Sequence, residues 1–404
     1  MATSPWRITL LLCGTEVLGL AGLATFSALL PTFIQDWTLS NTQAGWLSAV
    51  YYGAYVIAVP LLTAWTDRRD AKRILLGGLA IGALASLWFA WAASGFWSAL
   101  ILRFLAGISL AGIYMPGLKL LGDHTEGPGQ SRFVSFYTAS FSLGTSLSFL
   151  LAGEINLALG WRWAFATAGL LTLTGCVLLA AAVPPGKISG PDHHGASPTR
   201  IKAILGNRRV MAYILGYAAH MWELFSMRSW MVAFFTYSRQ LQATSGPALS
   251  PTQVLALINL IGLPASIGGN ELCRRLGRSR TLRGIMLASA LVSAAVGFSA
   301  RLPYFWVVCL GLIYGILVLG DSASLTAGAV ANAPAGSRGA TLAVHSTLGF
   351  GAAFLGPLAV GMVLDLLQGN ADLAWGMAFI CMGAGCALGP LALRLQRRSG
   401  STQD

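Results

Sequence analysis

The sequence predicts an all-α integral membrane protein in which twelve transmembrane helices form two bundles of six. Three observations support this class: the composition, the number of apolar segments, and the placement of lysine and arginine. Of the 404 residues, 55% are hydrophobic and only 10% are charged, whereas about a quarter of an average soluble domain is charged. The composition therefore excludes a soluble globular domain and a disordered chain.

Twelve apolar segments are long enough to cross a bilayer, which takes about 20 residues in a helix. They cover residues 8–34, 43–65, 74–93, 96–118, 133–153, 162–183, 210–235, 252–271, 284–300, 304–330, 340–364 and 373–393. Several segments are longer than a single crossing needs. We therefore expect tilted or kinked helices among them.

Lysine and arginine predict the orientation of these spans. With the N-terminus placed inside, 21 of the 26 basic residues fall in segments that face the cytoplasm. Membrane proteins keep an excess of basic residues on that side. We therefore expect a multi-pass protein of the cell membrane with both termini in the cytoplasm, and the short loops favour a bacterial inner membrane.

The loop at 184–209 is the longest polar stretch and divides the chain into two halves. Its first part is rich in proline, glycine and serine and predicts a linker, whereas the basic part from Thr199 predicts a short amphipathic helix at the inner membrane surface. We expect an N-terminal bundle at 1–183, a C-terminal bundle at 210–393 and a tail at 394–404. A shift of about 207 residues superposes Gly144 on Gly351. Two repeats related by a pseudo-twofold axis are typical of transporters.

Four short motifs follow one another along the chain. They are Asp67-Arg68-Arg69-Asp70-Ala71-Lys72-Arg73 after span 2, Arg103 with Gly107 in span 4, Gly160-Trp161-Arg162-Trp163 before span 6, and Arg275-Leu276-Gly277-Arg278 after span 8. Together with the twelve spans and the central linker, they resemble the major facilitator superfamily over nearly the whole chain. The first motif departs from the family pattern at Thr63, Asp70 and Ala71, and span 5 lacks the Gly-Pro motif of many proton antiporters.

The resemblance implies a gate on the cytoplasmic side and a polar path through the membrane. Asp67 would meet the N-terminus of span 11, where the helix dipole attracts an anion. The resemblance further implies that spans 1, 4, 7 and 10 line a central cavity. The residues of the gate motif are Asp67, Arg68, Arg275, Gly277 and Arg278.

Seven ionisable residues lie well inside the predicted spans, where charges are costly and mark functional sites. Six of the seven fall on spans 1, 4, 7 and 10. This is the distribution expected if these four spans line a polar transport path. The seven are Glu16, Arg103, His220, Glu223, Arg228, Asp321 and His345.

We assign the acidic residues a proton-coupling role and the basic ones a pairing or substrate-binding role. Glu16 and Glu223 are 207 residues apart, at equivalent depths of the two halves, and Asp321 is the third candidate. Two carboxylates in apolar surroundings need cations to stay ionised, so we expect Arg103 to attend one of them and His220 the other. Arg228, His345 and Trp222 complete the set of pairing or substrate-binding candidates. The alternative is a set of static ion pairs that fix helix packing.

We expect a secondary transporter of a small solute driven by the proton gradient, with symport favoured. The alternative in the same class is drug or metabolite efflux by proton antiport, and the alternative of another class is a membrane sensor or scaffold without turnover. No Walker loop and no His-Glu-x-x-His motif occurs, so we expect no enzyme, cofactor or bound metal. The expected partners are the solute, protons and the lipid bilayer. Nucleic acid is excluded because no basic cluster is interleaved with aromatics. The oligomeric state is left open.

Overall fold

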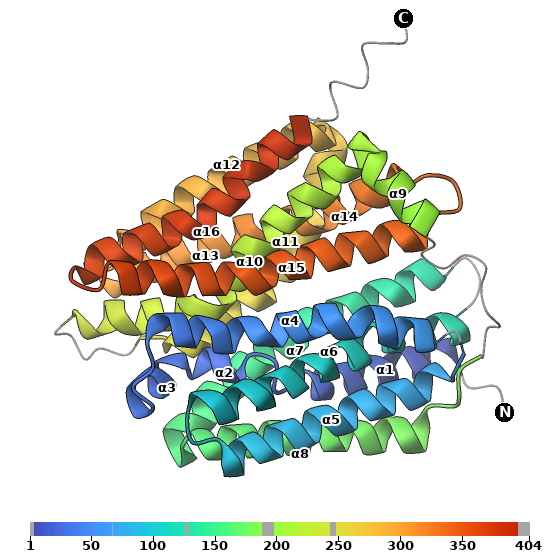
Figure 1. Cartoon of the computed structure of the whole chain (residues 1–404), viewed down its shortest axis with the longest axis horizontal. Helices are drawn as coiled ribbons and strands as arrows, with labels where there is room; N and C mark the ends of the chain where they lie inside the picture. The colour runs from blue at the N-terminus through green and yellow to red at the C-terminus, as the bar shows by residue number, and fades with distance from the viewer. Residues whose placement is uncertain (1–3, 67, 126–128, 188–197, 243–247, 395–404) are drawn as a thin grey trace, which may run out of the picture. The chain divides into compact units, whose positions relative to one another are not determined.

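The computed structural model describes residues 4–66, 68–125, 129–187, 198–242 and 248–394, and all regular elements in these ranges are helices (Figure 1). The predicted all-α class is therefore confirmed. The chain divides into two compact units. Residues 1–37 and 50–192 form unit 1, and residues 38–49 and 193–404 form unit 2.

The helices of unit 1 follow the first six predicted spans. They are α1 (Pro5–Gly19), α2 (Thr25–Ala28), α3 (Leu30–Asp36), most of α4 (Asn41–Trp65), α5 (Ala71–Ala92), α6 (Phe96–His124), α7 (Gln130–Leu159) and α8 (Trp161–Ala182).

Unit 2 contains the start of α4 and the remaining helices. These are α9 (Pro198–Gly206), α10 (Arg208–Gln240), α11 (Pro251–Leu276), α12 (Arg278–Gly297), α13 (Tyr304–Gly320), α14 (Ser322–Ala331), α15 (Arg338–Leu366) and α16 (Ala371–Arg394). The short helix predicted from Thr199 onward is present as α9.

Within the described residues, nine stretches are long and apolar enough to cross a membrane. They match nine of the twelve predicted spans: α4 to α8, α11, α13 with α14, α15 and α16. The other three predicted spans coincide with α1 to α3, α10 and α12. These are less apolar or less continuous, because the first is interrupted, α10 carries several charged residues, and α12 begins with three arginines.

Each unit buries an apolar core of its own. In unit 1 the core joins α1, α5 and α6 through Ile8, Leu75 and Ile113. In unit 2 it joins α10 and α12 through residues such as Ile214 and Met286. Ile204 of α9 is fully buried in this second core, so the helix at the end of the linker packs on unit 2.

The first span is broken in its middle, and the prediction of one continuous helix over 8–34 is wrong. The helix α1 ends at Gly19 and α2 begins only at Thr25. The side chain of Ser148 on α7 satisfies two backbone groups at the break: its hydroxyl accepts from the N–H of Ala24 (3.0 Å) and donates to the carbonyl of Ala21 (2.7 Å). Irregular backbone is tolerated at membrane depth only with such partners.

The tenth span is broken as well, at Asp321. The helix α13 ends at Gly320 and α14 begins at Ser322, whereas the sequence predicts one helix over 304–330. Gly269 of α11 lies against this break, because a Cβ added to it would be 1.8 Å from the carbonyl oxygen of Gly320. Glycine therefore lets the backbone of α11 reach the interruption.

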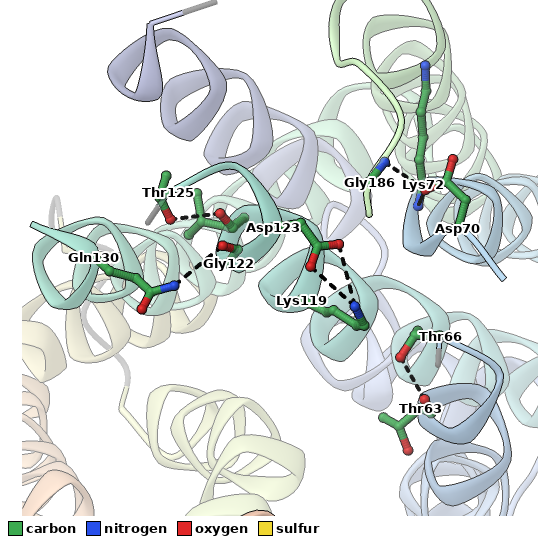
Figure 2. Close-up of polar contacts among 11 residues, drawn as sticks. Thr63, Thr66, Asp70, Lys72, Lys119, Gly122, Asp123, Thr125, Gln130 and Gly186 are labelled. Atoms are coloured by element: carbon green, nitrogen blue, oxygen red, sulfur yellow. Dashed lines mark hydrogen bonds and ion pairs between the residues drawn. The ribbon is translucent and has the colours of Figure 1, made fainter. Parts of the chain in front are cut away.

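At one end of unit 1, polar contacts hold the loops that join its helices (Figure 2). The carboxylate of Asp70 accepts from the N–H of Lys72 (2.9 Å), capping α5, and from the N–H of Gly186 (2.9 Å), just after α8. Lys119 pairs with Asp123 at 3.2 Å on α6. The departure of Asp70 from the resembled motif therefore has a structural reason. The expected gate residue Asp67 lies outside the described residues.

We predict that Ser148→Ala destabilises the protein, because it leaves the N–H of Ala24 without its partner and removes one of the two donors to the carbonyl of Ala21, the other being the hydroxyl of Thr25. Each buried unsatisfied group costs about 1–3 kcal/mol. Equilibrium unfolding in mixed detergent micelles should show this loss. Thr138→Val is the matched control, since the Thr138 hydroxyl only donates to the carbonyl one turn earlier on the exposed side of α7. Equal stability of the two variants would contradict the role of Ser148.

Candidate functional site

Glu16 of unit 1 is buried in the last turn of α1, just before the break in the first span. Its carboxylate accepts a hydrogen bond from the hydroxyl of Ser140 on α7. Arg103 of α6 is buried too, but its guanidinium lies over the rings of Phe26 (5.0 Å) and Tyr51 (4.4 Å). The expectation that Arg103 pairs with this glutamate is therefore wrong. The carboxylate of Glu16 is hydrogen-bonded by a hydroxyl, and the guanidinium of Arg103 makes cation–π contacts with aromatic rings.

His220 of unit 2 pairs with Asp321, and not with Glu223 as expected from the sequence. The Nδ1 atom of His220 on α10 lies 2.7 Å from Oδ1 of Asp321, at the break between α13 and α14. Both residues are 1% exposed. The helix break thus places a carboxylate beside an imidazole within the core of unit 2.

Glu223 faces a different set of neighbours, although it lies one turn after His220 on α10. Its Oε1 accepts from the hydroxyls of Ser289 on α12 (3.1 Å) and Tyr314 on α13 (3.2 Å). The residue is fully buried. Residues three apart on a helix differ by about 60° in direction, and in a tightly packed bundle this turns the two side chains towards different helices.

His345 extends the group formed by His220 and Asp321 onto α15. Its ring stacks on Tyr217 of α10 with 3.7 Å between centroids, and its Nε2 lies 3.2 Å from the hydroxyl of Thr326 on α14. The rings of Tyr217 and His220 are 5.7 Å apart. Three helices of unit 2 therefore bring two histidines and one carboxylate together.

The hydroxyl residues of both groups were not predicted from the sequence. Ser140, Tyr217, Ser289, Tyr314 and Thr326 contact the acids and histidines. Such residues are common in membrane helices, where they also bond to their own backbone. Only Tyr217 carries a usable signal, because it lies three residues before His220 on the same helix.

Arg228 and Trp222 of α10 are held by their own partners. The Nε of Arg228 donates to Oδ1 of Asn259 on α11 (2.9 Å), and its guanidinium lies 5.4 Å from the ring of Phe225. The indole N–H of Trp222 donates to the carbonyl of Cys381 on α16 (3.0 Å). Trp222 thus anchors α10 to α16, and Arg228 is oriented by an amide.

The gate-motif residues after α11 form the turn into α12. Arg275 pairs with Glu271 at 2.8 Å, and both are exposed. Gly277 has a φ of +92°, a conformation that favours glycine, and Arg278 begins α12. In the first copy of the motif, Arg68 is exposed in the turn after α4. In the second copy, Gly277 thus fixes the sharp turn between the two helices.

The unit 2 group has the composition of a proton-exchange site. Imidazole and carboxylate can pass a proton between them, and hydroxyls can bond to either form. In the described ranges, no three histidine, cysteine or acidic side chains are arranged to hold a metal ion. Imidazole and carboxylate side chains can in general bind and release protons.

Known proteins resemble the chain in sequence and in fold. The family model of the Major Facilitator Superfamily matches residues 12–357. Protein spinster homolog 1 of Rattus norvegicus is 25% identical over 289 residues, which cover 67% of this chain and 55% of the relative. The Niacin transporter NiaP of Acinetobacter baylyi is 22% identical over 294 residues, or 65% of this chain and 66% of the relative. The chain thus matches little more than half the length of the rat protein.

The fold is similar to that of a solved transporter. The crystal structure of a bacterial homolog to the human lysosomal transporter Spinster, in an inward-facing and unoccupied conformation, superposes with a TM-score of 0.77. The two chains are 17% identical, and the superposition covers 98% of each. This likeness confirms the predicted fold class at the level of architecture, and the nine membrane-capable stretches of the described residues are consistent with twelve spans.

We predict that His220→Gln and Asp321→Asn are not additive in their effect on stability. Each single change leaves one buried partner behind and should cost several kcal/mol, whereas the double variant should recover about 0.5–3 kcal/mol of the summed loss. Equilibrium unfolding in mixed micelles measures the cycle. The exposed pair of Glu271 and Arg275 is the control and should give a coupling below about 1 kcal/mol. Strict additivity at His220 and Asp321 would contradict the pairing.

Proposed function

The chain belongs to the major facilitator superfamily, and from this premise we propose that it couples the transport of a small solute to the movement of protons, with uptake by symport favoured. Membership makes the protein a multi-pass secondary transporter of small solutes. Proton coupling and direction are the steps that the proposal adds. The buried pair of His220 and Asp321 carries it, with 2.7 Å between Nδ1 and Oδ1.

The position of this pair supports a coupling role. Asp321 lies at a break in its span, between α13 and α14, so the backbone there is not fixed by continuous helix bonds. A small change in the angle between the two helices would separate the carboxylate from His220. A separated carboxylate in apolar surroundings is costly unless it takes up a proton. Proton binding and helix geometry are therefore linked at this point.

The two glutamates support the proposal in a second way. Hydroxyl groups donate to both glutamates: that of Ser140 to Glu16, and those of Ser289 and Tyr314 to Glu223, which is also bonded by the thiol of Cys386. Hydroxyls satisfy a carboxylic acid as well as a carboxylate, because they both donate and accept. Hydroxyl neighbours therefore accommodate both the protonated and the ionised form of a glutamate, whereas a neighbouring guanidinium would stabilise the ionised form.

Efflux by proton antiport would use the same residues. The absence of a proline in span 5 (residues 133–153) disfavours it, because many antiporters of the resembled family carry a Gly-Pro motif there. The direction of solute flux under a fixed proton gradient separates the two. A sensor without turnover would show no flux at all.

We further propose that the protein lies in a bacterial inner membrane with both termini in the cytoplasm. The support is the placement of 21 of the 26 lysines and arginines on one side of the predicted spans, because basic loops remain in the cytoplasm. In this topology the α15–α16 turn faces outwards, and the segment after α8 faces inwards.

We predict that Asp321→Asn, Glu223→Gln and Glu16→Gln each lower proton-driven accumulation by tenfold or more, while exchange of solute across the membrane persists. The neutral amides cannot carry a proton, but they preserve shape and hydrogen bonding. Proteoliposomes with an imposed pH gradient and a lumenal pH dye are challenged with amino acids, organic acids, sugars and toxic cations. Solute counterflow in the same vesicles measures the exchange of solute across the membrane in the absence of a pH gradient.

Glu271→Gln is the matched control for these three variants. Glu271 is an exposed acid that pairs with Arg275 on the surface of α11, so its loss should leave accumulation unchanged. Normal accumulation and an unchanged pH profile in all three buried variants would overturn the proton-coupling proposal.

We predict that an impermeant thiol reagent labels Gln368→Cys in intact cells and Pro185→Cys only after permeabilisation. Both positions are exposed, so the difference reports sidedness and not burial. The parent protein, whose described cysteines are buried or half-buried, provides the background. Labelling of Pro185→Cys in intact cells would reverse the proposed topology.

A further inference from the structure

A buried hydroxyl lies one turn beyond Asp321 in unit 2. Ser324 of α14 is fully buried and follows Asp321 by three residues, a spacing that makes two side chains neighbours on a helix. Within the described residues its hydroxyl has no oxygen or nitrogen partner, although buried hydroxyls are nearly always hydrogen-bonded. A hydroxyl in this position can accept a proton from one neighbour and donate its own to another.

The helix α11 supplies the next polar group, the thiol of Cys273. The close approach of Gly269 to Gly320 sets the register between α11 and the break in the tenth span. Cys273 lies four residues after Gly269, and Ser324 lies four residues after Gly320. The two spans run in the same direction, so the side chains meet one turn later. The thiol of Cys273 contacts the hydroxyl of Ser324 and interacts with the carboxylate of Asp321.

Cys273 lies close to the end of α11 that faces the cytoplasm in the proposed topology. The helix ends three residues later at Leu276, which is exposed. Arg278, the first residue of α12, interacts with the thiol. The packing around Cys273 is apolar, because it belongs to the core of unit 2 together with Leu282 and Leu325. The thiol is therefore a polar group within an apolar wall, one turn from the surface.

We propose that Ser324 and Cys273 form a proton relay inside unit 2, which connects Asp321 to the cytoplasmic surface at the α11–α12 turn. This inference rests on the proposed proton coupling and topology. When Asp321 is discharged, its carboxyl O–H bond breaks and the proton passes to the hydroxyl oxygen of Ser324. The original hydroxyl proton passes to the sulfur of Cys273, and the original thiol proton passes to water at the turn. Each bond to hydrogen that breaks is matched by one that forms, and rotation of the two groups resets the relay.

Titratable groups face Asp321 from three helices, α10, α11 and α16. They are His220, Tyr217, Glu223, Cys273 and Cys386. Cys273 also interacts with Arg278 at the start of α12, so it links the buried pair to that surface. A guanidinium stays protonated in proteins, and Arg278 therefore takes no part in the transfer itself.

The relay predicts a rate that can be measured without a transported solute. Proteoliposomes that expose the α11–α12 turn on their outer face receive a pH jump, and time-resolved infrared spectroscopy follows the carbonyl band of protonated carboxyl groups. The part of this signal that Asp321→Asn removes belongs to Asp321. The rate at which it appears reports proton delivery, and its midpoint pH in a slow titration reports the equilibrium.

Substitutions at Cys273 separate a relay from simple packing. Cys273→Ala removes the S–H group, whereas Cys273→Ser keeps a group that donates and accepts. In an apolar core a packing role favours alanine, because a buried hydroxyl is costly, whereas a relay favours serine. Cys309→Ala and Thr281→Val are the matched controls. Cys309 is a half-buried thiol on α13, and the hydroxyl of Thr281 donates to the carbonyl of Gly277 one turn earlier.

We expect Cys273→Ala and Ser324→Ala to slow the protonation of Asp321 by at least about tenfold, because a positioned proton-transferring group is lost. The midpoint pH should stay that of the parent, since a relay changes the rate and not the equilibrium. Cys273→Ser and the two controls should match the parent in both measurements.

Three results would overturn the relay: an unchanged rate in both alanine variants, equal slowing in Cys273→Ser or in the controls, or a shift of the midpoint pH that accounts for the slower rate. If Asp321→Asn removes no signal, Asp321 takes up no proton, and the proposed coupling at this residue fails together with the relay. If the Asp321 signal is present and the alanine variants leave its rate unchanged, the relay alone fails.

Discussion

A backbone polar group that this chain places inside the bilayer needs a partner on the protein wherever lipid excludes water. The broken first span depends on this constraint. The hydroxyl of Ser148 accepts from the N–H of Ala24 and donates to the carbonyl of Ala21, which also accepts from the hydroxyl of Thr25.

The same constraint explains how the acidic residues are distributed in unit 2. Asp321 lies where α13 stops, and it is paired with an imidazole. Glu223 lies within a continuous helix, and it is bonded by two hydroxyls. An imidazole can share or give up a proton, whereas hydroxyls accommodate either form of an acid. The chain thus gives its buried carboxylates in unit 2 two different kinds of partner, an imidazole for Asp321 and hydroxyls for Glu223.

The sequence was sufficient for the fold class and for most helix positions, because apolar length and basic loops are local signals. The partners of the buried charged residues could not be predicted from the sequence. Spacing placed His220 near Glu223, but packing against α12, α13 and α14 turned the two side chains apart. The break after Gly19 was hidden within an apolar run, since its satisfying residue, Ser148, lies 124 residues away from Ala24. Contacts between residues so far apart in the chain produce no periodic pattern in the sequence, so the sequence does not reveal them.

The acid at the end of α15, Asp365, caps the N-terminus of another helix, α4. The resemblance to the family implies that an acid after span 2 meets the N-terminus of span 11. The structure shows the same chemistry with the roles exchanged: the acid belongs to the end of α15, and the capped N-terminus belongs to α4.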